Sequence, residues 1–215
     1  QSIIFPLHKK GARNVINNYR GLSFMNTLPK IYAGLLLERL TSWMEERSTL
    51  NEFQAGFRKK YSTIDNIFNL TCLVNIKLRV KRSKVYAFFI DFASVFDRVN
   101  RDYLWYKLSM EGLSTKFIAA ISSLYASTES AVKLASSSTT DYFQTSTGVK
   151  QGCLLSPSLF SIFLNDLHEF LEEGVWVGDR EVRHLAYADD VILLSSSVIG
   201  LQRMINRLGD YCSRW

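Results

Sequence analysis

The sequence predicts an α+β fold, because helical segments and short apolar strands follow one another in mixed order and most strands are adjacent along the chain. The 215 residues are 47% hydrophobic and 21% charged, a composition typical of a globular protein that buries a sizeable core. A Rossmann-type fold would require regular alternation of strand and helix, which this order lacks.

Two helices are expected in the first eighty residues. Residues 28–47 and 61–80 both repeat apolar residues at helical spacing. In the first helix the apolar stripe comprises Ile31, Leu35, Leu36, Leu40 and Trp43. In the second, which opens with Ser62 and Thr63 as cap candidates, it comprises Ile64, Ile67, Phe68, Thr71 and Val74.

The middle of the chain begins with "VYAFFID", a continuous apolar run that ends in the single charge of Asp91. Such a run predicts a buried central strand. Two helices are expected next, over residues 101–112 and 114–126, with a break at Gly112. Strands are expected over residues 131–135 and 141–149, around a serine-rich loop.

The last third begins with one predicted helix, "SPSLFSIFLNDLHEFLEEG". Ser156 is its N-cap, Pro157 its first helical residue, and Gly174 lies past its end. The elements expected after it are a hairpin around Gly178–Asp179, strands at Leu185–Tyr187 and Val191–Leu194, and a final helix over residues 198–212.

The charge is unevenly distributed along the chain. The net charge is +6, but residues 1–84 carry +10 and the remainder carries −4. A basic segment indicates a polyanionic partner such as nucleic acid, and an acidic segment indicates a place where carboxylates gather. A merely solvated basic face is the alternative.

The sequence shows no signal for a membrane or for secretion. No apolar run approaches the roughly eighteen residues of a membrane span, and the first residues lack the pattern of a secretory signal. Cys72, Cys153 and Cys212 show no metal-ligand spacing. We therefore expect reduced thiols in an intracellular protein.

Three aspartates are the candidate catalytic residues. Asp189 and Asp190 lie between two predicted strands, and Asp91 ends another. If the strand that ends at Asp91 and the strand before Asp189 are neighbours in one sheet, the three carboxylates form an oxygen-rich site suited to Mg²⁺ or Mn²⁺. A solvent-exposed hairpin turn is the alternative interpretation of the Asp189–Asp190 pair.

Six sequence blocks together resemble the reverse transcriptase domain of non-LTR (LINE-type) retrotransposons. They occur in that family's order and span nearly the whole chain. The blocks are "PLHKKGARNVINNYRGLSFMNTLPKIYAGLLLERL", "NEFQAGFRKKYSTIDNI", "AFFIDFASVFDRVNRDYL", "GVKQGCLLSPSLFSIFLNDL", "LAYADDVILL" and "LQRMINRLGDYCSRW".

The resemblance implies the fingers and palm of a right-hand polymerase, with an antiparallel palm sheet backed by helices and no thumb. Residues 1–84 and 118–150 would form the fingers, and residues 85–117 and 151–215 the palm. The implied partners are an RNA template, a DNA primer and a deoxynucleoside triphosphate. A thumb, and an endonuclease where one exists, would belong to the rest of a longer protein. A retrotransposon protein is expected in the nucleus and the cytoplasm.

The resemblance also assigns the metal site. Asp91, Asp189 and Asp190 would form the catalytic cluster and bind two Mg²⁺ ions, for which Mn²⁺ is a possible substitute. The backbone carbonyl of Phe92 would face the metal that carries the triphosphate. Tyr187 would support the primer end.

The nucleotide-binding residues follow from the same resemblance. Phe96 would lie under the incoming sugar and exclude a ribose 2′-hydroxyl, while Gln151 and Gly152 would contact the nucleotide and the template base. Arg20 would bind the triphosphate together with a neighbouring lysine, Lys9 or Lys10, between which the sequence does not choose. Arg58 and Lys59 would contact the template backbone.

Each assignment has a structural alternative. Phe96 could be core, Gln151–Gly152 a simple turn, Arg20 a surface ion pair, and residues 58–60 a solvated loop. Asp97 is interpreted as a helix-start residue or as an ion-pair partner of Arg98 or Arg101.

Two other functions compete with a polymerase for the chain as a whole. One is an inactive or domesticated copy that acts as a nucleic-acid-binding scaffold. The other is a metal-dependent nuclease, which would share the acids but would not explain "KQGCLLSP" or Phe96.

Overall fold

The computed structural model describes residues 2–126, 128–134 and 138–215. The chain forms two compact units, each built from two separate segments. The first unit comprises Gln1–Glu46 and Ser94–Leu159, and the second comprises Arg47–Ala93 and Phe160–Trp215. The division into fingers and palm made from the sequence stays a prediction.

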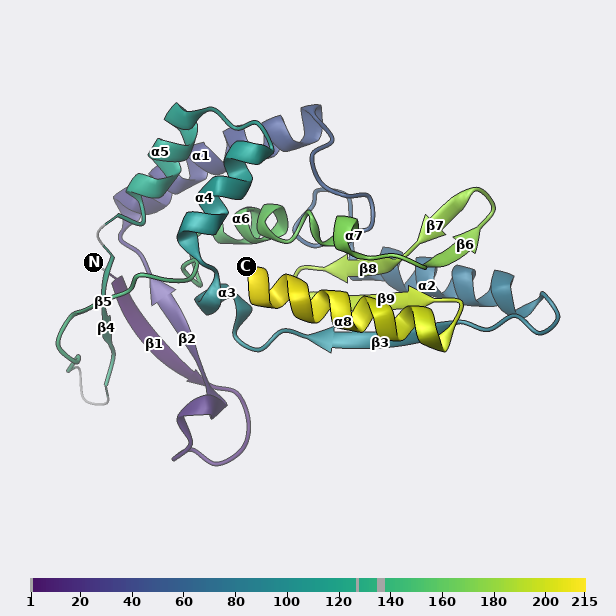
Figure 1. The fold of residues 1–215 in the computed structure, drawn as a ribbon. Coiled ribbons are helices and arrows are strands. Elements are labelled where there is room, and N and C mark those ends of the chain that lie inside the picture. The colour runs from purple at the N-terminus through teal and green to yellow at the C-terminus, as the bar shows by residue number, and fades with distance from the viewer. Residues whose placement is uncertain (1, 127, 135–137) are drawn as a thin grey trace. The chain divides into compact units, whose positions relative to one another are not determined.

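The first unit contains a four-stranded sheet in the order β2-β1-β4-β5 (Figure 1). The strands are β1 (Ser2–His8), β2 (Tyr19–Phe24), β4 (Glu129–Val132) and β5 (Phe143–Gln144). The helices are η1 (Ile16–Asn18), α1 (Thr27–Glu46), α3 (Val95–Arg98), α4 (Arg101–Met110), α5 (Thr115–Ser123) and the start of α6 (Ser156–Phe163). The helices expected over residues 28–47, 101–112 and 114–126 are therefore confirmed.

The helices of the first unit bury leucine and isoleucine side chains. Leu40 of α1, Leu104 and Leu108 of α4, and Ile121 of α5 are all inaccessible to solvent. The guanidinium of Arg39 lies over the Phe117 ring, 5.4 Å from its centroid, which links α1 to α5.

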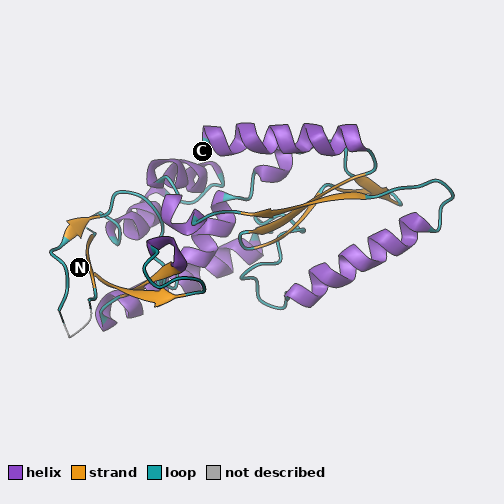
Figure 2. Ribbon diagram, turned by 90° about the horizontal axis from the view of Figure 1, so that it is seen from below, coloured by secondary structure: helices purple, strands orange, loops and turns teal. Residues whose placement is uncertain are grey.

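The second unit contains a three-stranded antiparallel sheet in the order β3-β9-β8. Its strands are β3 (Tyr86–Asp91), β8 (His184–Tyr187) and β9 (Asp190–Ser195), and a separate hairpin is formed by β6 (Val175–Val177) and β7 (Arg180–Val182). The helices are α2 (Thr63–Leu78), α7 (Leu167–Phe170) and α8 (Val198–Arg214). Figure 2 shows α8, the helix that ends at the C label, on one face of this sheet and α2 on the other.

The helix α2 forms where it was predicted, but of its predicted apolar stripe only Val74 packs against the core. The Asp65 carboxylate accepts hydrogen bonds from the backbone N–H and the hydroxyl of Ser62, which fixes the start of the helix. Ile64, Ile67 and Phe68 are exposed, whereas Leu73 packs with Val175, Leu185 and Leu194 in the core under the sheet. The side of α2 that contacts the sheet therefore carries Leu73, whereas the side that carries Ile64, Ile67 and Phe68 faces solvent.

The strand β3 forms as predicted, but it is not the buried central strand that was expected. Within the described residues β3 is an edge strand that pairs only with β9. Phe88 and Phe89 are 39% and 68% exposed, respectively. An apolar run indicates a favourable strand, but its burial depends on elements elsewhere in the chain that cover it.

The single helix expected from Ser156 to Gly174 is also corrected, because the chain breaks into α6 and α7 between Phe163 and Leu167. The Tyr211 hydroxyl donates to the Phe163 carbonyl at 3.1 Å and to the Asp166 carboxylate at 2.7 Å. The Asn165 amide donates to the Thr49 carbonyl at 2.9 Å. Partners distant in sequence therefore replace helical hydrogen bonds at this point.

The two strands expected around the serine-rich loop are shorter than predicted. β4 ends at Val132 and β5 comprises only Phe143 and Gln144. Residues 135–137, which include the predicted end of the first strand, lie outside the described residues. No helix of the described chain is long and apolar enough to cross a membrane.

Candidate active site

The acidic residues meet at one end of the second unit's sheet. Asp91 is the last residue of β3, and its partner in the β3–β9 ladder is Asp190. Asp189 lies in the two-residue turn that joins β8 to β9. Directly opposed residues share a face of the sheet, with Cβ atoms roughly 4.5–5.5 Å apart. The strand that ends at Asp91 and the strand before Asp189 belong to one sheet, as supposed from the sequence, but they are not direct neighbours because β9 lies between β3 and β8.

The negative charges at this sheet end affect one another. Burial raises the pKa of Asp190, and the charges of Asp189 and Asp91 raise it further. Carboxylate oxygens are the ligands that Mg²⁺ and Mn²⁺ prefer, so the donor set fits these ions. Within the described residues, however, no three His, Cys, Asp or Glu side chains are positioned closely enough to hold an ion as they stand.

A second group of predicted residues lies in the first unit, around the β1–β2 hairpin. Arg20 faces Leu7 across the ladder, and the pairing continues past β1 with a hydrogen bond of 2.8 Å from the Lys9 N–H to the Asn18 carbonyl. Desolvation raises the pKa of Asp97, and the positive charges of Arg20 and Lys9 act against that rise. Of the two candidate lysines, Lys9 is the one whose charge acts on Asp97, and the choice between Lys9 and Lys10 at the triphosphate stays a prediction.

Asp97 lies in the first turn of α3, as the helix-start interpretation expected, and it has a further role that was not predicted. Its carboxylate accepts two hydrogen bonds of 3.0 Å from the Nε2 of Gln151, instead of pairing with Arg98 or Arg101. Desolvation of the carboxyl group raises the pKa of Asp97, against the lowering effects of Gln151, Arg20 and Lys9. A cavity of about 290 Å³ is lined by Asp97, Gln151 and other residues of the first unit.

Gly152 is held against the edge of β2. Its φ of +111° lies in the region that favours glycine, and an added Cβ would be 2.4 Å from the Ser23 carbonyl oxygen. The Ser23 N–H donates to the Gln151 carbonyl at 2.8 Å. The Gln151–Gly152 pair is therefore fixed on both sides, by β2 and by Asp97.

Phe96 belongs to the same group of residues. It is half-buried in the short helix α3, and its carbonyl accepts a hydrogen bond of 2.7 Å from the Val149 N–H. Gly148 packs closely on Asp97, where an added Cβ would be 2.7 Å from the backbone oxygen. The loop that leads to Gln151 is thus attached to α3 by backbone contacts.

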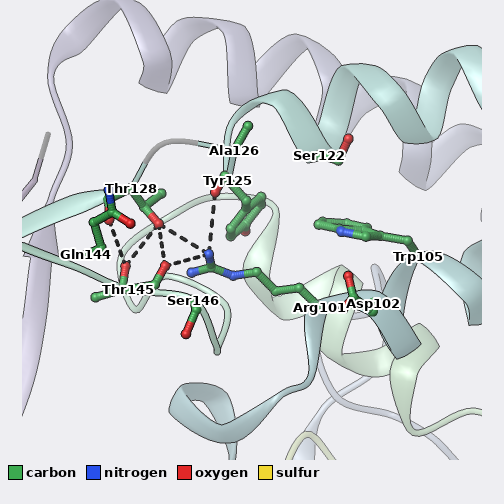
Figure 3. A pocket seen from close by; sticks show the side chains of 10 residues that line it. All are labelled: Arg101, Asp102, Trp105, Ser122, Tyr125, Ala126, Thr128, Gln144, Thr145 and Ser146. Carbon is green, nitrogen blue, oxygen red and sulfur yellow. Dashed lines mark hydrogen bonds between the residues drawn. The ribbon is translucent and has the colours of Figure 1, made fainter.

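Arg101 organises this loop, a role that was not predicted from the sequence. The Arg101 guanidinium donates to the carbonyls of Thr145 (2.7 Å), Gly148 (2.9 Å), Thr147 (3.0 Å) and Tyr125 (3.4 Å), and to the Thr128 hydroxyl (3.2 Å). Figure 3 shows it among several of these partners, beside a cavity of about 400 Å³. Desolvation lowers the pKa of Arg101. No pattern in the local sequence predicts that several loop carbonyls will accept hydrogen bonds from one guanidinium.

The remaining predicted residues have local roles in the second unit. The Arg58 side chain donates to the Asn51 and Gln54 carbonyls and stacks on the Tyr61 ring, 4.3 Å from its centroid. Lys59 is exposed, and Phe92 follows directly after β3.

Two further predicted residues have simple positions. Tyr187 is the residue of β8 that pairs with Asp190, so it adjoins the acidic end of the sheet. Lys10, in the first unit, is exposed.

Comparisons with known proteins identify the family of the chain. Residues 7–215 match the family described as "Reverse transcriptase (RNA-dependent DNA polymerase)". The chain is 32% identical over 222 residues to a probable RNA-directed DNA polymerase from transposon BS of Drosophila melanogaster, covering 99% of this chain and 24% of that protein. It is 28% identical over 228 residues to the RNA-directed DNA polymerase from mobile element jockey of the same species, covering 99% and 24%.

Solved structures with a similar fold include telomerases. Apo telomerase from Candida tropicalis, truncated from its C-terminal domain, matches with a TM-score of 0.61 at 15% identity, over 89% of this chain and 44% of that one. Telomerase from Candida albicans, in complex with an RNA fragment, matches with a TM-score of 0.60 at 13% identity, over 97% and 40%. The chain spans about a quarter of the length of the curated relatives cited above.

Proposed function

Since this chain belongs to the reverse transcriptase family, we propose that it is the part of a non-LTR retrotransposon polymerase that joins deoxynucleotides to a primer on an RNA template. The observation that carries the proposal is the ladder register that sets Asp91 opposite Asp190, next to the Asp189 turn. The reaction is attack of a primer 3′-hydroxyl on the α-phosphate, with pyrophosphate as the leaving group.

The acids of the second unit supply the ligands for this reaction. Asp91, Asp189 and Asp190, with the carbonyl of Phe92, would hold two divalent cations. These ions would activate the 3′-hydroxyl and stabilise the departing pyrophosphate. Burial raises the pKa of Asp190 and the neighbouring carboxylates raise it further, so divalent cations that offset the negative charge would draw the three side chains together.

The residues of the first unit bind the nucleotide. Arg20 and Lys9 carry the positive charge for the triphosphate. Because the Gln151 Nε2 is engaged by Asp97, the amide oxygen of Gln151 is the end that remains to accept a hydrogen bond from the nucleotide. Asp97 thereby sets the orientation of that amide.

The test of the proposal is primer extension on an RNA template by the full-length protein that carries this sequence. Asp189→Asn should reduce the extension rate by about a thousandfold or more, because the chemistry depends on the metal ligands. Asp179→Asn, which changes an exposed aspartate of the β6–β7 hairpin in the same unit, is the matched control and should leave the rate unchanged.

The same assay separates the competing functions. Extension that survives Asp189→Asn would contradict the polymerase proposal. Tight RNA binding without extension would favour a scaffold, and release of nucleotides without extension would favour a nuclease.

The selection of deoxynucleotides tests the proposed role of Phe96. Phe96→Ala should admit ribonucleotides, because the ring that collides with a 2′-hydroxyl is removed. The measurement is the ratio of kcat/KM for deoxynucleotide and ribonucleotide. An unchanged ratio would assign Phe96 to the core alone.

A further inference from the structure

The turn that carries Asp189 has an unfavourable backbone conformation. Ala188, the residue before Asp189, has a φ of 59°. A residue with a side chain seldom adopts this left-handed conformation, because its Cβ then approaches the neighbouring carbonyl oxygen. Such a conformation persists only where the surrounding structure holds it.

One buried side chain contacts both backbone polar groups of Ala188. The Gln54 Oε1 accepts a hydrogen bond of 3.1 Å from the Ala188 N–H, and its Nε2 donates to the Ala188 carbonyl at 3.4 Å. The same Oε1 accepts from the Gly56 N–H at 2.9 Å. Gln54 is only 4% exposed, so these contacts are shielded from water.

The segment around Gln54 is also bonded to the end of β8. The Ala186 N–H donates to the Phe53 carbonyl at 2.9 Å, and the Ala55 N–H donates to the Ala186 carbonyl at 2.9 Å. An added Cβ on Gly56 would be 2.0 Å from the Ala188 nitrogen, so the two backbones are as close as glycine allows. The backbone contacts of Phe53, Ala55 and Gly56 therefore hold the side-chain amide of Gln54 next to Ala188.

We propose that Gln54 is a positioning residue for Asp189: its side-chain amide holds Ala188 in the left-handed conformation and so fixes the direction of the Asp189 carboxylate. Gln54 lies 134 residues before Ala188 and makes no contact with substrate in this role. The inference rests on the proposed function, in which Asp189 is a metal ligand.

The first test needs no substitution. Hydrogen exchange of the Ala188 amide, followed by NMR or mass spectrometry, should be slow and comparable to that of β9 amides, although Ala188 lies in a two-residue turn beside exposed acids. Exchange as fast as in the β6–β7 turn would overturn the proposal.

The second test replaces the hydrogen bonds and keeps the volume. Gln54→Met should accelerate Ala188 exchange about tenfold or more, which is the effect of losing a buried hydrogen bond. It should also weaken Mn²⁺ binding about tenfold, measured by electron paramagnetic resonance with Asp189→Asn as the reference for lost binding. Primer extension should slow in kcat, with little change in KM for the nucleotide.

The control is Tyr211→Phe, which removes a buried hydroxyl with two hydrogen bonds in the same unit. It should leave Ala188 exchange and Mn²⁺ affinity unchanged. A Gln54→Met protein with wild-type exchange and Mn²⁺ affinity, or a Tyr211→Phe protein with the same losses, would refute the positioning role.

Adding Ala188→Gly to Gln54→Met separates strain from packing. Glycine adopts a positive φ without the Cβ penalty, so the double variant should recover part of the Mn²⁺ affinity. No recovery would refute the proposal that Gln54 acts by holding a strained residue. Slow Ala188 exchange and Asp189-dependent Mn²⁺ binding in a wild-type protein that does not extend primers would contradict the proposed function and leave the positioning of Asp189 intact.

Discussion

Gly56→Ala is the substitution whose effect follows most directly from the structure. An added Cβ would be 2.0 Å from the Ala188 nitrogen, 2.8 Å from its Cα and 2.9 Å from the Tyr187 carbonyl carbon. Non-bonded atoms are in favourable contact at about 3.5–4.0 Å. All three atoms belong to the backbone, so no side chain can rotate to relieve the clash.

The cost of the substitution can be derived from the contacts it would disturb. Moving the two backbones apart by roughly 1.5 Å would restore ordinary contact distances. The same movement would break the hydrogen bond of 2.9 Å from the Ala55 N–H to the Ala186 carbonyl and the bond of 3.1 Å between Ala188 and Gln54. Each buried group left unpaired costs about 1–3 kcal/mol, so we expect a loss of about 3–5 kcal/mol. For a chain of this length that loss lowers the Tm by roughly 10 °C.

The assay is thermal unfolding followed by circular dichroism. Gly209→Ala is the matched control, because Gly209 lies inside α8 and an added Cβ there would meet no atom within 4 Å. Alanine is the better helix former, so the control should raise the stability by about 0.5–1 kcal/mol. A Gly56→Ala protein that unfolds at the wild-type temperature would refute the close packing of this segment on the Asp189 turn.

Three further predictions concern His184, Arg101 and Gly152. Burial, followed by the charges of His168 and Arg183, lowers the pKa of His184 from 6.5 to about 4, so unfolding binds a proton in this range. The free energy of unfolding should therefore fall by about 3 kcal/mol as the pH decreases from 6.5 to 4, and His184→Gln should flatten that dependence in urea titrations at several pH values. Arg101→Lys should cost about 2 kcal/mol in denaturant unfolding, because an ammonium group cannot reach the spread of carbonyls that the guanidinium contacts; a loss under 0.5 kcal/mol would contradict this. Gly152→Ala should raise the KM for the nucleotide and lower the stability, since its φ of +111° and the Ser23 carbonyl at 2.4 Å both oppose a side chain; steady-state kinetics with an unchanged KM would argue against that placement.

The elements that local signals describe were predictable from the sequence. Ser62 begins α2 as its position indicated, and the runs that flank Asp189 and Asp190 form adjacent strands. These features depend on neighbours within a few residues or on strand alternation, which a sequence displays directly.

What could not be predicted depends on contacts between distant segments. The hydrogen bond from Gln151 to Asp97 joins residues 54 positions apart, and that from Ala188 to Gln54 joins residues 134 apart. The break before α7 depends on Tyr211, 48 residues after the carbonyl that its hydroxyl contacts. A polar side chain in sequence gives no sign of which distant backbone group it will satisfy.

The edge position of β3 has a practical consequence for handling the protein. Within the described residues, no strand pairs with the side of β3 that faces away from β9, so its amide and carbonyl groups can bond to a strand of another molecule. The run Ala87–Ile90 contains neither a charge nor a proline to discourage such pairing, and Phe89 presents its ring to water. Concentrated solutions of a protein of this sequence should therefore self-associate through intermolecular β-structure, and Phe89→Lys should keep it monomeric during purification.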